Sequence, residues 1–104
     1  MSNPVNSETF KQLAAQDLLL VADFSATWCG PCKKLSPIID EVATEFEGKA
    51  NIVKVDVDES DDLAIEFGIR SVPTVLFIKG GQVVDKFVGA LPKSEVVAKV
   101  QANL

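Results

Sequence analysis

The sequence contains no histidine and only two cysteines, Cys29 and Cys32, among its 104 residues. A closed structural zinc site takes four ligands, and these are usually cysteine or histidine. A zinc site in this chain would therefore need carboxylates or a second subunit to complete it. The composition disfavours a zinc-binding protein and leaves the cysteine pair to be explained in another way.

Two further features are missing, namely an excess of basic residues and a long apolar run. The 15 acidic and 10 basic side chains leave a formal net charge of −5, which opposes binding to nucleic acid or to an anionic membrane surface. No apolar stretch approaches the roughly 20 residues that span a bilayer. Residues 1–4 carry neither the basic segment nor the apolar core of an export signal. We therefore expect a cytoplasmic protein that binds neither nucleic acid nor membranes.

Internal repeats and Ser/Pro-rich linkers are also absent, and the length suits one hydrophobic core, so we expect a single domain over residues 1–104. Four stretches have the apolar character of strands, at 18–24, 52–57, 74–79 and 82–88. The dipeptide Gly80-Gly81 between the last two suits a tight turn, which predicts an antiparallel hairpin.

Helical patterns alternate with these strands. Ser7 is placed to cap a short first helix. The strongest helical pattern covers residues 35–46 and contains Pro37, which should bend the axis. Further helices are expected over 61–67 and 92–104. The final helix is expected to turn Val96, Val97, Val100 and Leu104 toward the core. Alternating helices and strands that end in a hairpin predict a mixed sheet with helices on both faces.

The cysteine pair falls between a predicted buried strand and the start of the strongest helix. In a reducing compartment such a pair is more often metal-binding or catalytic than structural, and a bridge this local stabilises a fold by only about 2 kcal/mol. Backbone N–H groups at the helix start stabilise a thiolate on Cys29, while Gly30 permits a tight turn and Pro31 fits a first helical turn. Cys32, one turn into the helix, should be less exposed. The pattern predicts that Cys29 attacks a substrate disulfide and Cys32 resolves the mixed disulfide.

These features resemble the thioredoxin family along nearly the whole chain. The resemblance rests on Ala22-Asp23-Phe24, Trp28 to Lys33, Pro37, Lys54 with Val55 and Asp58, Gly68 to Thr74, Gly81, and Val88-Gly89-Ala90-Leu91. The Cys-x-x-Cys of thioredoxin is a well-known redox motif. The resemblance implies an α/β thioredoxin fold with a central mixed five-stranded sheet flanked by four helices. It also implies a monomer without a cofactor of its own, which receives electrons from NADPH through a flavin-containing thioredoxin reductase and passes them to disulfides of other proteins.

Asp23 is unusual because a carboxylate inside an apolar strand is costly to bury without a purpose or a partner. A strand-end aspartate that reaches water is the simpler alternative. By resemblance, Asp23 lies beneath the active site and relays a proton for the resolving cysteine, with Lys54 near it. By itself Lys54 is more simply a polar residue on a half-buried strand. Many family members carry tryptophan where this chain has Ser25, which affects the expected packing below the active site.

Another group of residues matches the substrate-docking positions of the family. A lone proline such as Pro73 more simply starts a strand, and an isolated Trp or Val-Gly is usually packing or a turn. By resemblance, however, the Val72–Pro73 bond is cis and lies beside the disulfide, where the Val72 backbone pairs with an extended substrate segment. The residues expected at this docking surface are Trp28, Gly30, Pro31, Val72, Pro73, Val88 and Gly89.

Two other functions compete with disulfide reduction. A disulfide oxidase or isomerase uses the same chemistry, but resembling proteins of that kind carry a histidine between the cysteines or an export signal. The Gly30-Pro31 pair therefore favours reduction. From a different class, the chain could be a redox-independent subunit of a larger complex. Retention of partner function after both cysteines become serine would distinguish that role.

Overall fold

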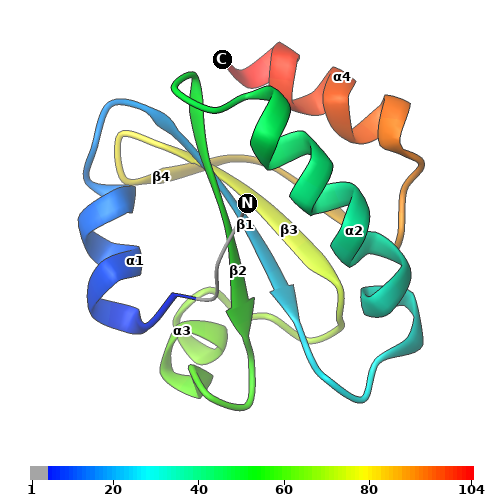
Figure 1. Cartoon of the computed structure of the whole chain (residues 1–104). Helices are drawn as coiled ribbons and strands as arrows, with labels where there is room; N and C mark the ends of the chain where they lie inside the picture. Colours follow the sequence, from blue (N-terminus) through cyan, green and yellow to red (C-terminus); the bar gives the residue numbers. More distant parts are fainter. Residues whose placement is uncertain (1–4) are drawn as a thin grey trace.

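A computed structural model describes residues 5–104, so residues 1–4, considered above for an export signal, lie outside it. Helices and strands alternate along this part of the chain as predicted (Figure 1). The elements are α1 (Ser7–Ala14), β1 (Leu19–Ser25), α2 (Gly30–Glu45), β2 (Ala50–Asp56), α3 (Asp61–Glu66), β3 (Thr74–Lys79), β4 (Gln82–Val88) and α4 (Lys93–Asn103). None of the helices within residues 5–104 is long and apolar enough to cross a membrane.

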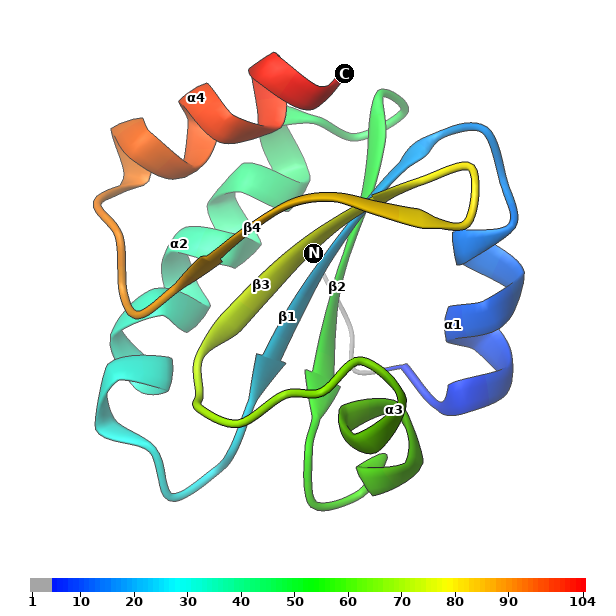
Figure 2. The ribbon, with the colours of Figure 1, turned by 180° about the vertical axis from the view of Figure 1, so that it is seen from behind.

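The strands form one mixed sheet in the order β2-β1-β3-β4. β1 runs parallel to β2 and antiparallel to β3, which returns through Gly80-Gly81 into antiparallel β4. The two glycines have φ of 60° and 79°, values that side chains disfavour and that the tight turn requires. The predicted hairpin is therefore confirmed, and β3 and β4 lie side by side in Figure 2.

The expectation of five strands is wrong for the described residues, whose sheet has four. β2 forms one edge of this sheet, and the Val5 amide donates a hydrogen bond to the Lys54 carbonyl oxygen there, over 3.0 Å. A strand pair needs a repeating series of such bonds. This single contact therefore extends the sheet edge without adding a strand within residues 5–104.

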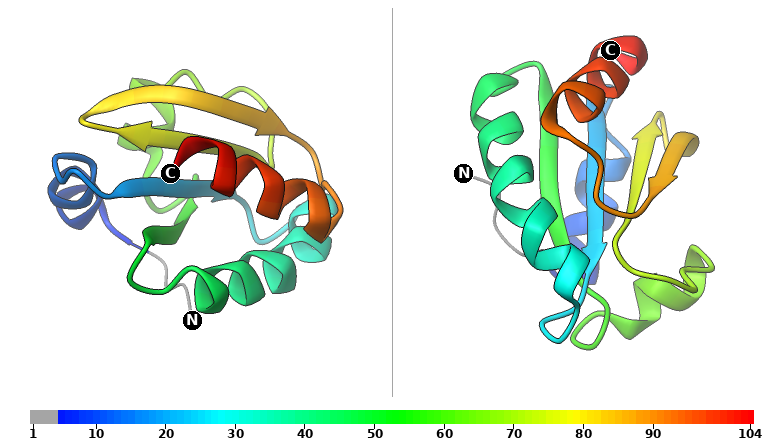
Figure 3. Two further views of the ribbon diagram at one scale, coloured as in Figure 1. Left: turned by 90° about the horizontal axis from the view of Figure 1, so that it is seen from above. Right: turned by 90° about the vertical axis from the view of Figure 1, so that its right-hand side faces the viewer.

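Helices cover both faces of the sheet because β1 is apolar on both sides. Leu19 and Val21 face one core, which α2 and α4 complete, while Leu20, Ala22 and Phe24 face a second core, completed by α1 and α3. Figure 3 shows these helices around the sheet from two directions. The near-continuous apolar run in the sequence is thus explained by a central strand buried on two faces.

Some local expectations about the helix ends are wrong. The cap of α1 is Asn6, whose side-chain oxygen accepts a hydrogen bond from the Thr9 amide over 2.9 Å, and Ser7 is already helical. At the other end of the chain, Val96 and Val100 are buried as expected, but Leu104 is 46% exposed because it lies beyond the last helical residue of α4. Pro37 lies inside α2, where the sequence placed it.

Candidate active site

Cys29 caps the N-terminus of α2 with its own sulfur. Its backbone is extended, with φ −96° and ψ 116°, and the helix begins at the next residue, Gly30. The Cys32 amide donates a hydrogen bond to Cys29 Sγ over 3.2 Å, and a disulfide joins the two cysteines. Once the disulfide is reduced, this amide and the positive end of the helix dipole favour a thiolate on Cys29.

Both cysteines are buried in a small apolar cluster. Cys29 is 5% and Cys32 3% exposed, and they pack with Ala26, Val57 and Val72. The sequence led us to expect a clearer difference in exposure between the two cysteines. In the oxidised form both are buried, and the capping position is what distinguishes Cys29.

The Val72–Pro73 peptide bond is cis, as the family resemblance implied. The Val72 carbonyl oxygen lies 3.6 Å from Cys29 Sγ. The Gly89 amide, just after β4, donates a hydrogen bond to the Pro73 carbonyl oxygen over 2.9 Å. The loop before β3 is therefore held between the disulfide and the end of β4.

Other expected docking residues lie exposed around the disulfide. Trp28 is 69% exposed, and its indole N–H donates a hydrogen bond to Asp58 Oδ2 over 3.0 Å. Trp28 and Val72 also line a shallow hollow of about 370 Å³. Gly30 and Pro31 border another hollow together with Lys34 and Ala90, and Val88 is 54% exposed at the end of β4. The structure thus places Val72, Trp28, Gly30 and Pro31 at or beside the cysteines, whereas Pro73 is buried and Val88 and Gly89 lie at the end of β4 that holds its loop.

Asp23 lies on the α2 side of the sheet. Side chains alternate between the two faces along a strand, so Asp23 shares a face with Leu19 and Val21, which pack in the core beneath α2. The residue is 1% exposed, and neither carboxylate oxygen has a hydrogen-bond partner among the described residues. Burial raises the pKa of Asp23 from 3.8 to about 7, with the Lys54 charge lowering it and the Asp40 charge raising it. The alternative of an exposed strand-end aspartate is excluded.

Lys54 is the register partner of Asp23 across β1 and β2, but its ammonium group binds elsewhere. Lys54 Nζ donates a hydrogen bond to Ser36 Oγ over 2.6 Å and pairs with Asp40 Oδ1 at 2.8 Å. Ser36 and Asp40 were missed in the sequence analysis. They follow Cys32 at intervals of four residues, which places all three on one face of α2. That spacing is the signal from which the contact could have been anticipated.

Ser25, where many family members have tryptophan, lies at the edge of a hollow of about 310 Å³ that also reaches Cys32 and Ser36. Cys32 itself is buried, so the small side chain of Ser25 borders this hollow without exposing the resolving cysteine. Within residues 5–104 there is no cluster of three or more histidine, cysteine or acidic side chains that could hold a metal ion.

A disulfide that can open and close at a helix N-terminus, on this α/β fold, defines a thiol-disulfide oxidoreductase. The comparisons with known proteins agree with this class. The thioredoxin family model matches residues 2–102. The chain belongs to the thioredoxin family.

Individual relatives support the family assignment over most of the chain. The thioredoxin of Haemophilus influenzae is 47% identical over 101 residues, which cover 96% of this chain and 94% of that protein. The thioredoxin of Chlorobaculum thiosulfatiphilum is 47% identical over 93 residues, or 89% of this chain and 86% of its own. The crystal structure of a Malassezia sympodialis thioredoxin superposes with a TM-score of 0.91 at 39% identity and covers 99% of this chain and 90% of its own.

Proposed function

We propose that this chain reduces disulfides in other proteins, with Cys29 as the nucleophile and Cys32 as the resolving thiol. The observation that carries the proposal is the capping of α2 by Cys29 Sγ, which accepts a hydrogen bond from the Cys32 amide. The Cys29 thiolate attacks one sulfur of the substrate disulfide and displaces the other as a thiolate. Cys32 then attacks Cys29 Sγ, releases the second substrate thiolate and closes the Cys29–Cys32 disulfide. The substrate gains two electrons and the chain loses two.

Asp23 is proposed to accept the proton that Cys32 must lose before it attacks. A buried carboxyl whose pKa is about 7 can act as a base near neutral pH. It lies on the same side of the sheet as α2, whose first turn carries Cys32. Lys54 acts with Asp23 through its charge, since its ammonium group binds Ser36 and Asp40.

Substrate docking is proposed to centre on the Val72 backbone. Its carbonyl oxygen lies 3.6 Å from Cys29 Sγ, so a peptide paired with Val72 would bring its own sulfur beside the nucleophile. The exposed side chains of Trp28 and Val88, together with Gly30, Pro31 and Gly89, would supply the surrounding contacts, and the buried Pro73 would hold the Val72 backbone in place.

We further propose that the chain works as a cytoplasmic monomer, one domain over residues 1–104, and that an NADPH-dependent thioredoxin reductase returns it to the dithiol form. The family membership and the Gly30-Pro31 pair between the cysteines support a role as an electron carrier in the reducing direction. An acidic net charge of −5 supports protein disulfides as substrates in preference to polyanions.

Reduction of insulin disulfides with NADPH and a thioredoxin reductase tests this function directly. The wild-type chain should consume NADPH and precipitate the insulin B chain, while the Cys29→Ser and Cys32→Ser variants should not turn over. Failure of the folded wild-type chain in this assay, with a partner function retained by the double cysteine variant, would support the redox-independent subunit instead.

A further inference from the structure

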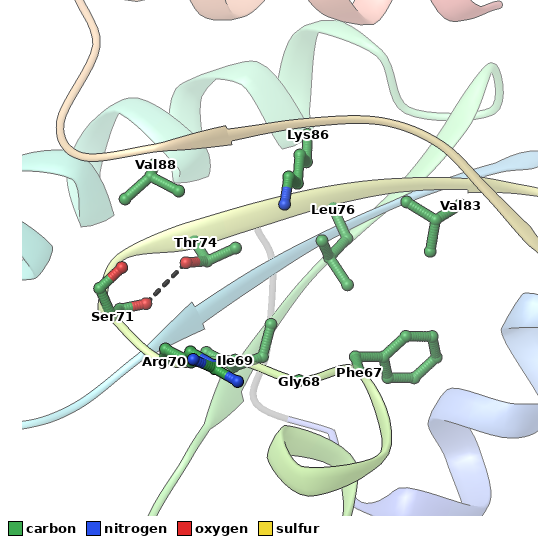
Figure 4. Close-up of a pocket in the computed structure, with 10 residues that line it drawn as sticks. All are labelled: Phe67, Gly68, Ile69, Arg70, Ser71, Thr74, Leu76, Val83, Lys86 and Val88. Atoms are coloured by element: carbon green, nitrogen blue, oxygen red, sulfur yellow. Dashed lines mark hydrogen bonds between the residues drawn. The ribbon is translucent and has the colours of Figure 1, made fainter.

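A groove of about 400 Å³ lies next to the disulfide site, between the end of α3, the loop that precedes β3 and the surface of β4 (Figure 4). Its floor is apolar and includes Ile69 and Leu76, and Val83 and Val88 of β4 form an apolar rim. Both rim valines are about half exposed, at 46% and 54%. The groove therefore offers unburied apolar surface to a partner.

Two cations face this apolar surface. Arg70 comes from the loop before β3 and Lys86 from β4, and Figure 4 shows them on opposite walls. Both side chains are exposed, and neither takes part in an ion pair within residues 5–104. Among residues 5–104 no acidic side chain lines the groove, although the chain as a whole carries a net charge of −5. The groove is thus a local basic site on an acidic protein.

The groove is continuous with the reactive centre through two of its lining residues. Ser71 directly precedes Val72, whose carbonyl oxygen lies 3.6 Å from Cys29 Sγ, and Val88 directly precedes Gly89, which holds Pro73. The hollow beside Trp28 also shares Ile69, Arg70 and Ser71 with the groove. An extended segment paired with Val72 can therefore continue into the groove.

We propose that this groove selects substrate proteins whose reactive cysteine is flanked by an extended segment of apolar and acidic residues. The acidic side chains pair with Arg70 and Lys86, while the apolar ones cover the floor and the β4 rim. The inference rests on the proposed disulfide-exchange function and adds a substrate class to it. Charge complementarity supports the proposal, because the net negative charge of the chain repels an acidic segment, whereas Arg70 and Lys86 in the groove attract one.

A set of synthetic peptides tests the preference. Each peptide carries one cysteine as a mixed disulfide with thionitrobenzoate, apolar neighbours, and a pair of Glu, Gln or Lys residues on one side of the cysteine. Peptides are made with the pair before the cysteine and with the pair after it, so that either direction of the bound segment is tested. The reduced Cys32→Ser variant attacks the peptide sulfur through Cys29 and releases the thionitrobenzoate thiolate, whose absorbance gives the rate. Intact mass confirms that the peptide stays on Cys29.

On at least one side of the cysteine, the Glu peptide should react about fivefold faster than its Gln counterpart at low ionic strength, as two exposed charge pairs permit. Added salt should reduce the ratio, since exposed charges are screened. Repulsion by the whole chain alone would give the reverse order, with the Lys peptide fastest. Attraction by the groove and repulsion by the whole chain therefore predict opposite orders of reaction rate for the Glu and Lys peptides.

Two double variants on the same Cys32→Ser background locate the effect. Arg70→Gln with Lys86→Gln should bring the Glu-to-Gln rate ratio to about one or below. Lys11→Gln with Lys49→Gln changes the net charge equally at exposed positions outside the groove and should keep the fivefold ratio. Folding of both variants is checked by their urea midpoints.

Three outcomes would overturn the inference. A Glu-to-Gln rate ratio of one or less, with the pair on either side of the cysteine, would contradict the substrate preference. The proposed disulfide-exchange function would still stand in that case if the Gln peptide reacts. Absence of reaction with every peptide would contradict both the substrate preference and the proposed disulfide-exchange function. The third outcome is that the wild-type chain self-associates in sedimentation, that the Arg70 and Lys86 substitutions abolish this association, and that no preference for the Glu peptide is found. The groove would then bind a second copy of the chain.

Discussion

The Lys54 ammonium group donates its hydrogen bond to Ser36 across 2.6 Å, although the sheet register places Lys54 opposite Asp23. The salt bridge with Asp40 at 2.8 Å holds the lysine toward α2 as well. Asp23 is left without a hydrogen-bond partner among the described residues, and the lysine charge acts on it only through space. Burial raises the pKa of this carboxyl to about 7, while the Lys54 charge lowers it and the Asp40 charge raises it, so substitutions at Asp40 and Lys54 should move the pKa in opposite directions.

Asp40→Asn should lower the pKa of Asp23. The change removes a negative charge that raises this pKa and frees Lys54, whose charge lowers it. Carboxyl-carbon NMR titration of the reduced protein measures the shift. Glu41→Gln is the matched control, since Glu41 pairs with Lys93 and should leave the Asp23 titration in place. An Asp23 titration unmoved by Asp40→Asn would show that Asp40 does not act on this carboxyl.

Lys54→Met should raise the pKa of Asp23 above its present value of about 7, because it removes the positive charge that favours the carboxylate. The pH profile of mixed-disulfide release should shift to higher pH by the same amount as the NMR titration. A release profile that stays in place while the titration moves would separate Asp23 from the proton transfer.

Asp23→Asn should remove a pH dependence of stability. The folded-state pKa of about 7 lies above the ordinary 3.8, so the folded form binds the proton more tightly than the unfolded chain. The contribution of Asp23 to the free energy of unfolding is therefore greatest below about pH 4, and it falls by about 4 kcal/mol as the pH rises to about 7. The variant should lack this fall and unfold at a higher urea concentration at pH 8. A difference in urea midpoint between the wild type and Asp23→Asn that stays constant from about pH 4 to 8 would contradict the raised pKa.

The same variant, Asp23→Asn, should slow release of the mixed disulfide more than its formation. Formation depends on the Cys29 thiolate, which the α2 N-terminus favours, whereas release requires Cys32 to lose a proton. Single-turnover rates between about pH 6 and 9, bracketing an ordinary thiol, measure the two steps. Release at the wild-type rate would mean that the proton leaves Cys32 by another route, such as the hollow beside Ser25.

Cys32→Ser should trap covalent complexes with substrate proteins, and Cys29→Ser should trap none. Without Cys32 the first attack still occurs, but nothing displaces the substrate from Cys29. Intact-mass analysis after exposure to oxidised insulin measures the adducts. Adducts on Cys32 of the Cys29→Ser variant that form as readily as those on Cys29 would show that this assignment of nucleophile and resolving thiol is wrong.

Gly89→Ala should lower the free energy of unfolding by about 1 kcal/mol and weaken substrate docking. Gly89 has φ of +93°, which an alanine adopts only with strain, and its amide holds the loop at Pro73. Urea midpoints and the KM for insulin measure the two effects. For stability, Gly30→Ala is the control, because Gly30 has no positive φ and open space where a Cβ would lie. Equal midpoints for the two variants would show that the loop is held by other contacts.

Features with a local cause were predictable from the sequence. The bounds of β3 and β4 follow from two apolar runs around Gly80-Gly81, and both match the structure. The position of Asp23 inside a buried strand follows from the apolar residues on either side of it. These patterns repeat with the period of the element itself, so neighbouring residues carry the information.

Features that depend on contacts between distant segments were not predictable in the same way. Ser36 and Asp40 bind a lysine from a different element, and nothing in their own neighbourhood marks them as partners. The choice of Asn6 over Ser7 as the α1 cap depends on which side chain reaches the Thr9 amide, a difference of one residue. The number of strands was taken from the family and not from a fifth apolar run in this chain.

The irregular pairing of β3 with β4 bears on how the protein behaves at high concentration. Phe77 pairs with Asp85 and Ile78 with Val83, so Val84 is an extra residue that bulges from the edge of the sheet. Val83 and Val84 are 46% and 48% exposed there, on a strand whose outer backbone groups could template fibril growth. The bulge interrupts the straight edge that a stacking strand needs, and the charged Asp85 and Lys86 follow it directly. The chain can thus keep an open sheet edge and still resist aggregation.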